Sequence, residues 1–157
     1  MEFRLGDVNG WKEDVCCVVV MLCAVSGKTP QEIAKVLQQA AAECGDTISE
    51  DLRRDYNIKH WLQAVKTLGG EYTISLDLVQ VPYEQRPTID SYLGSHTSGQ
   101  LEVVYCDDPK CKDSHVFATE AGQIVDTYTA GRKVTKHPVP ADYAGFHVKG
   151  VFLLSAS

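Results

Sequence analysis

The sequence predicts an α+β domain in which N-terminal helices pack on an antiparallel β-sheet. Helical periodicity dominates the first half of the chain, whereas the second half has mostly alternating and β-branched patterns. The chain has 157 residues, of which 44% are hydrophobic, and this is enough to bury a core. Because no internal repeat or linker divides it, we expect a single domain over residues 1–157.

Three helices are predicted in the first half. Residues 14–27 are apolar nearly all round, as in a helix surrounded by core, and Gly27 is a typical C-terminal cap. Residues 29–43 begin with Thr29, a proline and Glu32, which is the pattern of a capping box, and continue with one apolar stripe. A further helix is predicted around residues 58–68, where two glycines then stop it.

The second half has the pattern of a sheet. Residues 115–128 have the form of a β-hairpin, with two extended arms around a turn near Glu120 to Gly122. The other predicted elements are a short helix and three strands, at residues 87–94 for the helix and 71–81, 101–106 and 146–155 for the strands. The last of these strands is expected to close the sheet.

Charge and the N-terminal segment exclude several classes of partner. The formal net charge is −6, and the clustered Lys and Arg residues that hold nucleic acids are missing. The first residues lack the basic start and apolar core of a secretory signal. The apolar run over residues 15–25 is shorter than the roughly 20 residues of a membrane span. We therefore expect a cytoplasmic protein that binds neither nucleic acid nor membrane.

Two of the six cysteines stand where a nucleophile is expected. In a reducing compartment these residues should be thiols, and Cys16, Cys17 and Cys23 lie within one apolar segment. A cysteine at a helix N-terminus can act as a nucleophile, because the helix dipole and the exposed N–H groups favour the thiolate. Cys16 and Cys17 both meet this condition, although a buried core thiol is the simpler interpretation of either.

The predicted hairpin supplies a base and an acid. His115 starts its first arm, and Asp126 follows eleven residues later across the turn. Antiparallel pairing can return this carboxylate beside the imidazole, where it would orient the ring and stabilise its cationic form. The four other histidines lack an acid at this hairpin spacing; they are His60, His96, His137 and His147.

Two segments resemble papain-like cysteine peptidases. DVCCVVVMLCAVSGKTPQEIAKVL resembles the start of the small members, and HVFATEAGQIVDTY resembles their histidine and acid strands. Similar segments occur in bacteriocin-leader-processing peptidase domains and related bacterial and phage proteins. The resemblance implies a papain-like fold and a hydrolase that cleaves a peptide or protein substrate through a thioester, without cofactor or metal. It assigns the nucleophile to Cys17, with Cys16 as the second choice, the base to His115 and the orienting acid to Asp126.

The chain departs from the papain-like pattern upstream of the nucleophile. That pattern has a glutamine there as oxyanion donor, whereas this chain has Trp11. The backbone N–H of Cys17 would then supply more of the stabilisation. Trp11 itself is expected to cover the edge of the core or to wall a substrate cleft.

Three alternatives stay open at this point. The chain could be a catalytically inactive binding module with the same fold, which the missing glutamine favours. It could be an acyltransferase or a transglutaminase-type enzyme, since these share the order Cys, His, Asp. Finally, Cys106, Cys111 and His115 have a spacing that Zn²⁺ could use, but a second ligand pair at suitable spacing is missing.

Overall fold

The structure is a computed structural model that describes residues 2–48, 56–95, 99–108 and 113–157. The helices in these ranges are α1 (Cys17–Ser26), α2 (Pro30–Glu43), α3 (Ile58–Thr67) and α4 (Ile89–Ser95). The strands are β1 (Gly70–Asp77), β2 (Glu102–Asp108), β3 (Asp113–Glu120), β4 (Gln123–Val125), β5 (Val134–Thr135) and β6 (His147–Ala156). Every helix in the described ranges is too short or too polar to span a bilayer.

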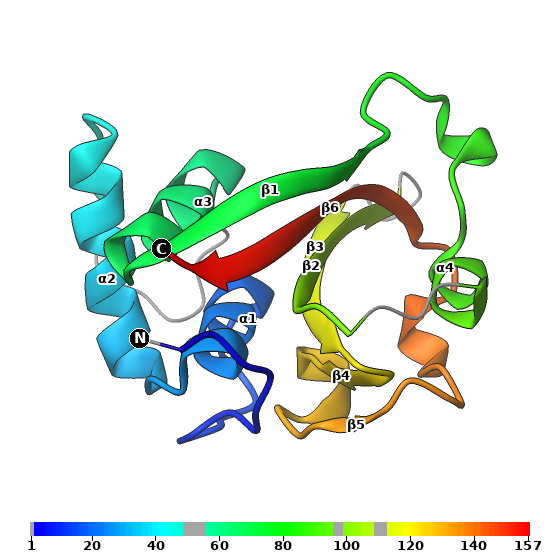
Figure 1. Cartoon of the computed structure of the whole chain (residues 1–157), viewed down its shortest axis with the longest axis horizontal. Coiled ribbons are helices and arrows are strands. Elements are labelled where there is room, and N and C mark those ends of the chain that lie inside the picture. The colour runs from blue at the N-terminus through cyan, green and yellow to red at the C-terminus, as the bar shows by residue number, and fades with distance from the viewer. Residues whose placement is uncertain (1, 49–55, 96–98, 109–112) are drawn as a thin grey trace.

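The strands form one antiparallel sheet in the order β1-β6-β2-β3-β4-β5. The last strand in sequence, β6, pairs with β1 on one side and with β2 on the other (Figure 1). It thus joins β1 to β2, which in turn pairs with β3, the first strand of the predicted hairpin. The short β5, which the sequence pattern did not predict, extends the other edge.

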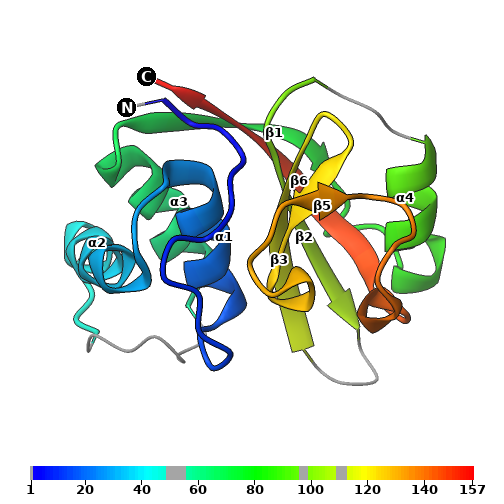
Figure 2. The same cartoon turned by 90° about the horizontal axis from the view of Figure 1, so that it is seen from below.

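The helices cover the two faces of the sheet unequally. α1, α2 and α3 lie together on one face, and α4 lies on the other (Figures 1 and 2). Because side chains alternate along a strand, Val116 and Ala118 of β3 pack with the α1–α3 layer, and Phe117 packs with Ile89 of α4. The predicted α+β class, with N-terminal helices on an antiparallel sheet, is confirmed.

α1 is stabilised mainly by packing against the core residues that surround it. Every residue from Val18 to Val25 is buried. Its valines lose rotamer freedom in a helix, but packing outweighs this loss. Gly27 ends the helix in the left-handed region, at φ 77°, and its N–H donates to the Cys23 carbonyl oxygen at 2.9 Å. The predicted helix is confirmed, but it begins at Cys17, because Cys16 has an extended backbone with ψ 160°.

Local signals define the neighbouring elements as predicted. Thr29 Oγ1 accepts from the Glu32 N–H at 3.3 Å, and Glu32 Oε1 accepts from the Thr29 N–H at 3.0 Å, which completes the capping box. Asn57 caps α3. Between β3 and β4, Ala121 and Gly122 have φ values of 50° and 81°, as a two-residue hairpin turn of the primed type requires.

Candidate active site

Cys17 is the first residue of α1 and lies at the edge of the helical layer. The N-cap residue, Cys16, makes no side-chain capping hydrogen bond. The first N–H groups of a helix have no intrahelical acceptor and carry partial positive charge, so a negative group is stabilised here. The segment before α1 links this helix to the loop after β4, since the Gly6 N–H donates to the carbonyl oxygen of Ala24, near the end of α1, and the Val8 N–H donates to that of Gly131.

His115 lies near the start of β3, opposite Cys106 of β2, and is 6% exposed. Its ring stacks on Tyr128, with centroids 4.6 Å apart and an interplanar angle of 19°. The Tyr143 and Phe146 rings approach it at 6.1 and 5.7 Å. These aromatic neighbours restrict the imidazole to one orientation.

Asp126 follows β4 directly and is 1% exposed. Its Oδ2 accepts from His115 Nε2 at 2.6 Å and also from the hydroxyl of Tyr143. Its Oδ1 accepts from the Thr127 N–H at 2.6 Å and from Thr127 Oγ1 at 3.2 Å, while the Asp126 N–H donates to Thr129 Oγ1. The hairpin therefore returns the carboxylate to the imidazole, as its spacing predicted, and a turn at the end of β4 anchors it.

The electrostatics of this cluster favour a charged imidazole. Burial of the ring lowers the pKa of His115, because a cation is costly away from water. The charge and hydrogen bond of Asp126, together with a hydrogen bond and charge from Cys17, outweigh burial and raise the pKa to about 10. Because Nε2 is bound to Asp126, Nδ1 is the ring nitrogen available to the Cys17 thiol. The raised pKa favours the imidazolium form of His115 at neutral pH.

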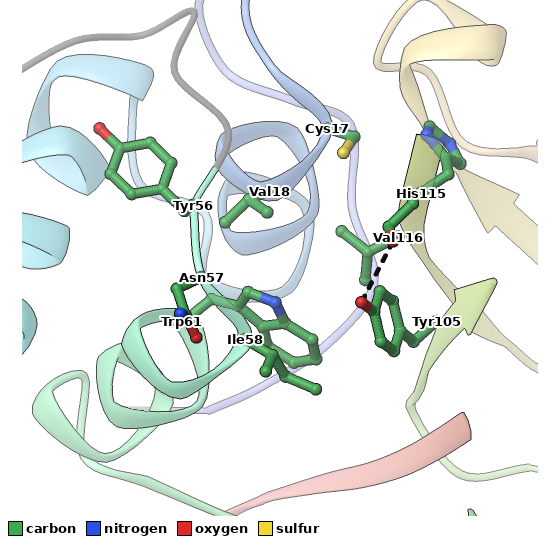
Figure 3. A pocket seen from close by; sticks show the side chains of 10 residues that line it. Cys17, Val18, Tyr56, Asn57, Ile58, Trp61, Tyr105, His115 and Val116 are labelled. Carbon is green, nitrogen blue, oxygen red and sulfur yellow. Dashed lines mark hydrogen bonds between the residues drawn. The ribbon is translucent and has the colours of Figure 1, made fainter. Parts of the chain in front are cut away.

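A cavity of about 390 Å³ opens at this point between α1, α3 and the start of β3. Figure 3 shows Cys17 on α1 across the opening from His115 on β3, with Trp61 of α3 and Tyr105 of β2 along the wall. Tyr105 donates its hydroxyl to Ser114 Oγ at 3.2 Å on the rim. The described lining combines aromatic and aliphatic side chains with uncharged polar ones and includes no Lys, Arg, Asp or Glu; it consists of Cys17, Val18, Tyr56, Asn57, Ile58, Trp61, Tyr105, Ser114, His115 and Val116.

The structure thus brings Cys17, His115 and Asp126 together from three separate segments. Cys17 lines the cavity and Cys16 does not, which favours Cys17 over the second choice. The competing histidines have other partners where they are described. His60 Nε2 pairs with Asp46 at 2.8 Å, and His147 stacks on Tyr83. His96 lies outside the described residues, and His137 is exposed on the loop after β5.

Two further sequence-based expectations concern Trp11 and a zinc site. Trp11 does not wall the cavity; it packs against the core, with its ring close to Gly131. For the zinc alternative, Cys111 lies outside the described residues. Cys106 is fully buried and directs its sulfur to the carbonyl oxygen of His115, and among the described residues no three potential ligands cluster.

Sequence reasoning did not identify the aromatic residues that support the site. Tyr143 and Tyr128 both contact the His115–Asp126 pair, and Trp61 lines the cavity in addition to its core packing. Tyr128 stands two residues after Asp126, and this nearness was the one signal available. Nothing in the pattern around Tyr143 indicates its hydroxyl's partner, because the contact depends on the path of the loop after β5.

Comparisons with known proteins give limited similarity. No protein-family model matches the chain. The 3-phosphoshikimate 1-carboxyvinyltransferase of Salmonella typhi is 24% identical over 137 residues, which cover 76% of this chain and 31% of that protein. The protein of the same name from Salmonella heidelberg is 24% identical, with 75% and 31% covered. The chain spans about a third of the length of these relatives, and identity of this degree does not assign it to their family.

One solved structure is similar over most of the chain. It is the peptidase domain of Streptococcus ComA, described as a bi-functional ABC transporter involved in a quorum sensing pathway. The alignment covers 83% of this chain and 95% of that domain, with 14% sequence identity and a TM-score of 0.33. A likeness of this degree defines neither the fold nor the activity of this chain, so the functional argument depends on the geometry of the site.

Proposed function

We propose that this chain is a papain-like cysteine hydrolase, a peptidase or isopeptidase, with Cys17 as nucleophile, His115 as base and Asp126 as orienting acid. One observation carries the proposal. The buried His115 ring lies between a thiol at a helix start and a buried carboxylate, which accepts from Nε2 at 2.6 Å. A core thiol has no need of such a partner, whereas a thiol nucleophile needs an adjacent base that a third group orients.

The reaction would begin from the Cys17 thiolate and the His115 imidazolium. The sulfur attacks the carbonyl carbon of the substrate, and the imidazolium donates its Nδ1 proton to the leaving amine as the C–N bond breaks. A thioester to Cys17 results. A water molecule then attacks this thioester and gives a proton to Nδ1, which releases the carboxylic acid and restores the starting pair. Throughout the reaction, Asp126 accepts the hydrogen bond from the Nε2–H of His115 and so keeps the imidazole in one orientation.

The helix start would stabilise the oxyanion in this mechanism. The upstream glutamine of the papain-like pattern is missing, and Trp11 packs on the core instead. The Cys17 backbone N–H, in the first turn of α1, is the donor that remains next to the sulfur. A reducing compartment such as the cytoplasm suits the reaction, and within the described residues no cysteine forms a disulfide.

Selective alkylation tests the proposal. Wild-type protein is treated with a limiting amount of iodoacetamide near pH 6, and the modified cysteine is mapped by mass spectrometry. Cys17 should react about tenfold faster than Cys44, a partly exposed thiol that serves as internal control. Preferential modification of Cys16, or equal rates at Cys17 and Cys44, would contradict the assignment.

Acyl transfer to Cys17 separates the enzyme from an inactive binding module, which the missing glutamine favours. A peptide p-nitrophenyl ester should leave an acyl group on Cys17 of the wild type, visible as a mass increase, and none on the Cys17→Ala variant. No acyl adduct on the wild type would support the inactive module.

Carboxyvinyl transfer, the reaction named for the Salmonella relatives, has no support in the cavity. Its described lining offers no Lys or Arg to a phosphorylated substrate.

A further inference from the structure

Asp126 Oδ2 has two donors, which is the unusual feature of the cluster. One is His115 Nε2 and the other is the hydroxyl of Tyr143, which comes from a turn seventeen residues later. The opposite oxygen, Oδ1, accepts from the backbone N–H and the hydroxyl of Thr127, within the turn that follows β4. Tyr143 therefore fixes the specific oxygen that faces the imidazole.

The Tyr143 ring is held firmly in this position. It belongs to a short 3₁₀ turn (Ala141–Tyr143) and is 3% exposed. Phe117 and Tyr128 contact the ring, with centroids 4.9 and 5.2 Å away. Burial, followed by the charge of Asp126, raises the pKa of Tyr143 well above its usual range, so the hydroxyl stays protonated and remains a donor.

A buried carboxylate keeps its charge only if hydrogen bonds replace the lost water. At Asp126 the protein supplies these donors, and Tyr143 is the one that shares an oxygen with His115. We propose that Tyr143 is a positioning residue, which directs Asp126 Oδ2 at His115. It thereby holds the imidazole in the orientation that stabilises the Cys17–His115 pair. This inference depends on the proposed function.

The chain provides a matched control for this role. Tyr92 is 9% exposed, and its hydroxyl donates at 2.8 Å to Oε2 of the buried Glu102. This second tyrosine–carboxylate pair lies in the packing between α4 and β2 and lines no part of the cavity that holds Cys17. Tyr143→Phe and Tyr92→Phe each remove one such hydroxyl, so their effects on folding should be similar.

The test is the rate of Cys17 alkylation by iodoacetamide from about pH 4 to pH 9. In the wild type, the rate should be nearly constant around neutral pH and fall on an acid limb. Tyr143→Phe should move this limb upward by about one pH unit, since a carboxylate that Tyr143 no longer directs at His115 stabilises the imidazolium, and through it the thiolate, less well. Tyr92→Phe should leave it in place. Coincident acid limbs in the wild type and both variants overturn the positioning role.

Failure of the proposed function gives a different result. In that case wild-type Cys17 shows no plateau, its rate rises through about pH 8.5 as for an ordinary thiol, and the role of Tyr143 is overturned with it. If Tyr143→Phe does not fold, 3,5-difluorotyrosine introduced at position 143 keeps the ring. This more acidic phenol is a stronger donor and should move the acid limb to lower pH; an unchanged limb contradicts the proposal.

Discussion

The described part of the chain contains two histidine–aspartate pairs with similar geometry and different surroundings. His115 and Asp126 meet at 2.6 Å, and His60 and Asp46 meet at 2.8 Å. The Asp126 side chain is 0% exposed, whereas 38% of the Asp46 side chain is exposed, and Asp46 also binds Lys59. Of the two histidines, only His115 lines the cavity, where it lies across from Cys17. The comparison indicates that burial of the carboxylate and a place on the cavity wall, more than the histidine–aspartate contact itself, distinguish the proposed site.

The two pairs should respond very differently to loss of the acid. Asp126→Ala removes a buried partner of His115 and leaves the hydroxyl of Tyr143 without its acceptor, so we expect the free energy of unfolding to fall by about 3 kcal/mol. Asp46→Ala should cost far less, because water replaces the carboxylate there. Urea unfolding monitored by circular dichroism measures both. Equal losses would contradict the contrast.

The pH dependence of the free energy of unfolding gives a second test of the buried pair. Folding raises the pKa of His115 from 6.5 to about 10. Its stabilisation is therefore complete below about pH 6.5 and is lost as the pH rises through about 10. The difference in unfolding free energy between wild type and His115→Gln should therefore shrink as the pH rises across this window. A difference that grows with pH would show that folding lowers the pKa of His115, which contradicts this account.

Replacing each histidine in turn tests which pair serves the thiol. His115→Gln should slow alkylation of Cys17 at neutral pH by about tenfold, because the cation that stabilises the thiolate is removed. His60→Gln should leave the rate within about twofold, since His60 does not line the cavity. The measurement is the pseudo-first-order rate at Cys17 by mass spectrometry. A similar rate in the wild type and His115→Gln would remove the ion pair from the account.

The smallest expected effect concerns stacking on the imidazole. The Tyr128 ring lies 4.6 Å from the His115 ring and stabilises the imidazolium cation. Tyr128→Leu removes this ring, so the Cys17 alkylation rate should fall by about threefold. Tyr83→Leu removes the analogous ring, 4.0 Å from His147, and serves as the control. If both variants changed the rate equally, the effect would be one of general destabilisation.

The elements with local signals could be predicted from the sequence. Thr29 and Glu32 form the capping box that their spacing indicated, and Gly27 ends α1. The eleven-residue interval from His115 to Asp126 also had a local origin, since a two-residue turn returns the second strand at a fixed register. The acid and the base were therefore predictable as a pair.

The remaining features depend on contacts between distant segments. The place of β6 between β1 and β2 follows from packing on both faces, and no short pattern specifies it. Tyr143 reaches Asp126 because the loop after β5 folds back over β3, and a tyrosine in such a loop gives no sequence signal of this contact. The position of Trp11 also depends on the close approach of Gly131.

Titration of the histidine rings by NMR tests the central claim most directly, namely that thiol, imidazole and carboxylate act as one unit. In wild-type protein the His115 ring should stay cationic at pH 7.5 and lose its proton near pH 10. Cys17→Ala should lower this midpoint, because the thiol contributes to the raised pKa, and should leave the His60 ring unchanged. A neutral His115 ring at pH 7.5, or a midpoint that does not respond to Cys17→Ala, would contradict the account.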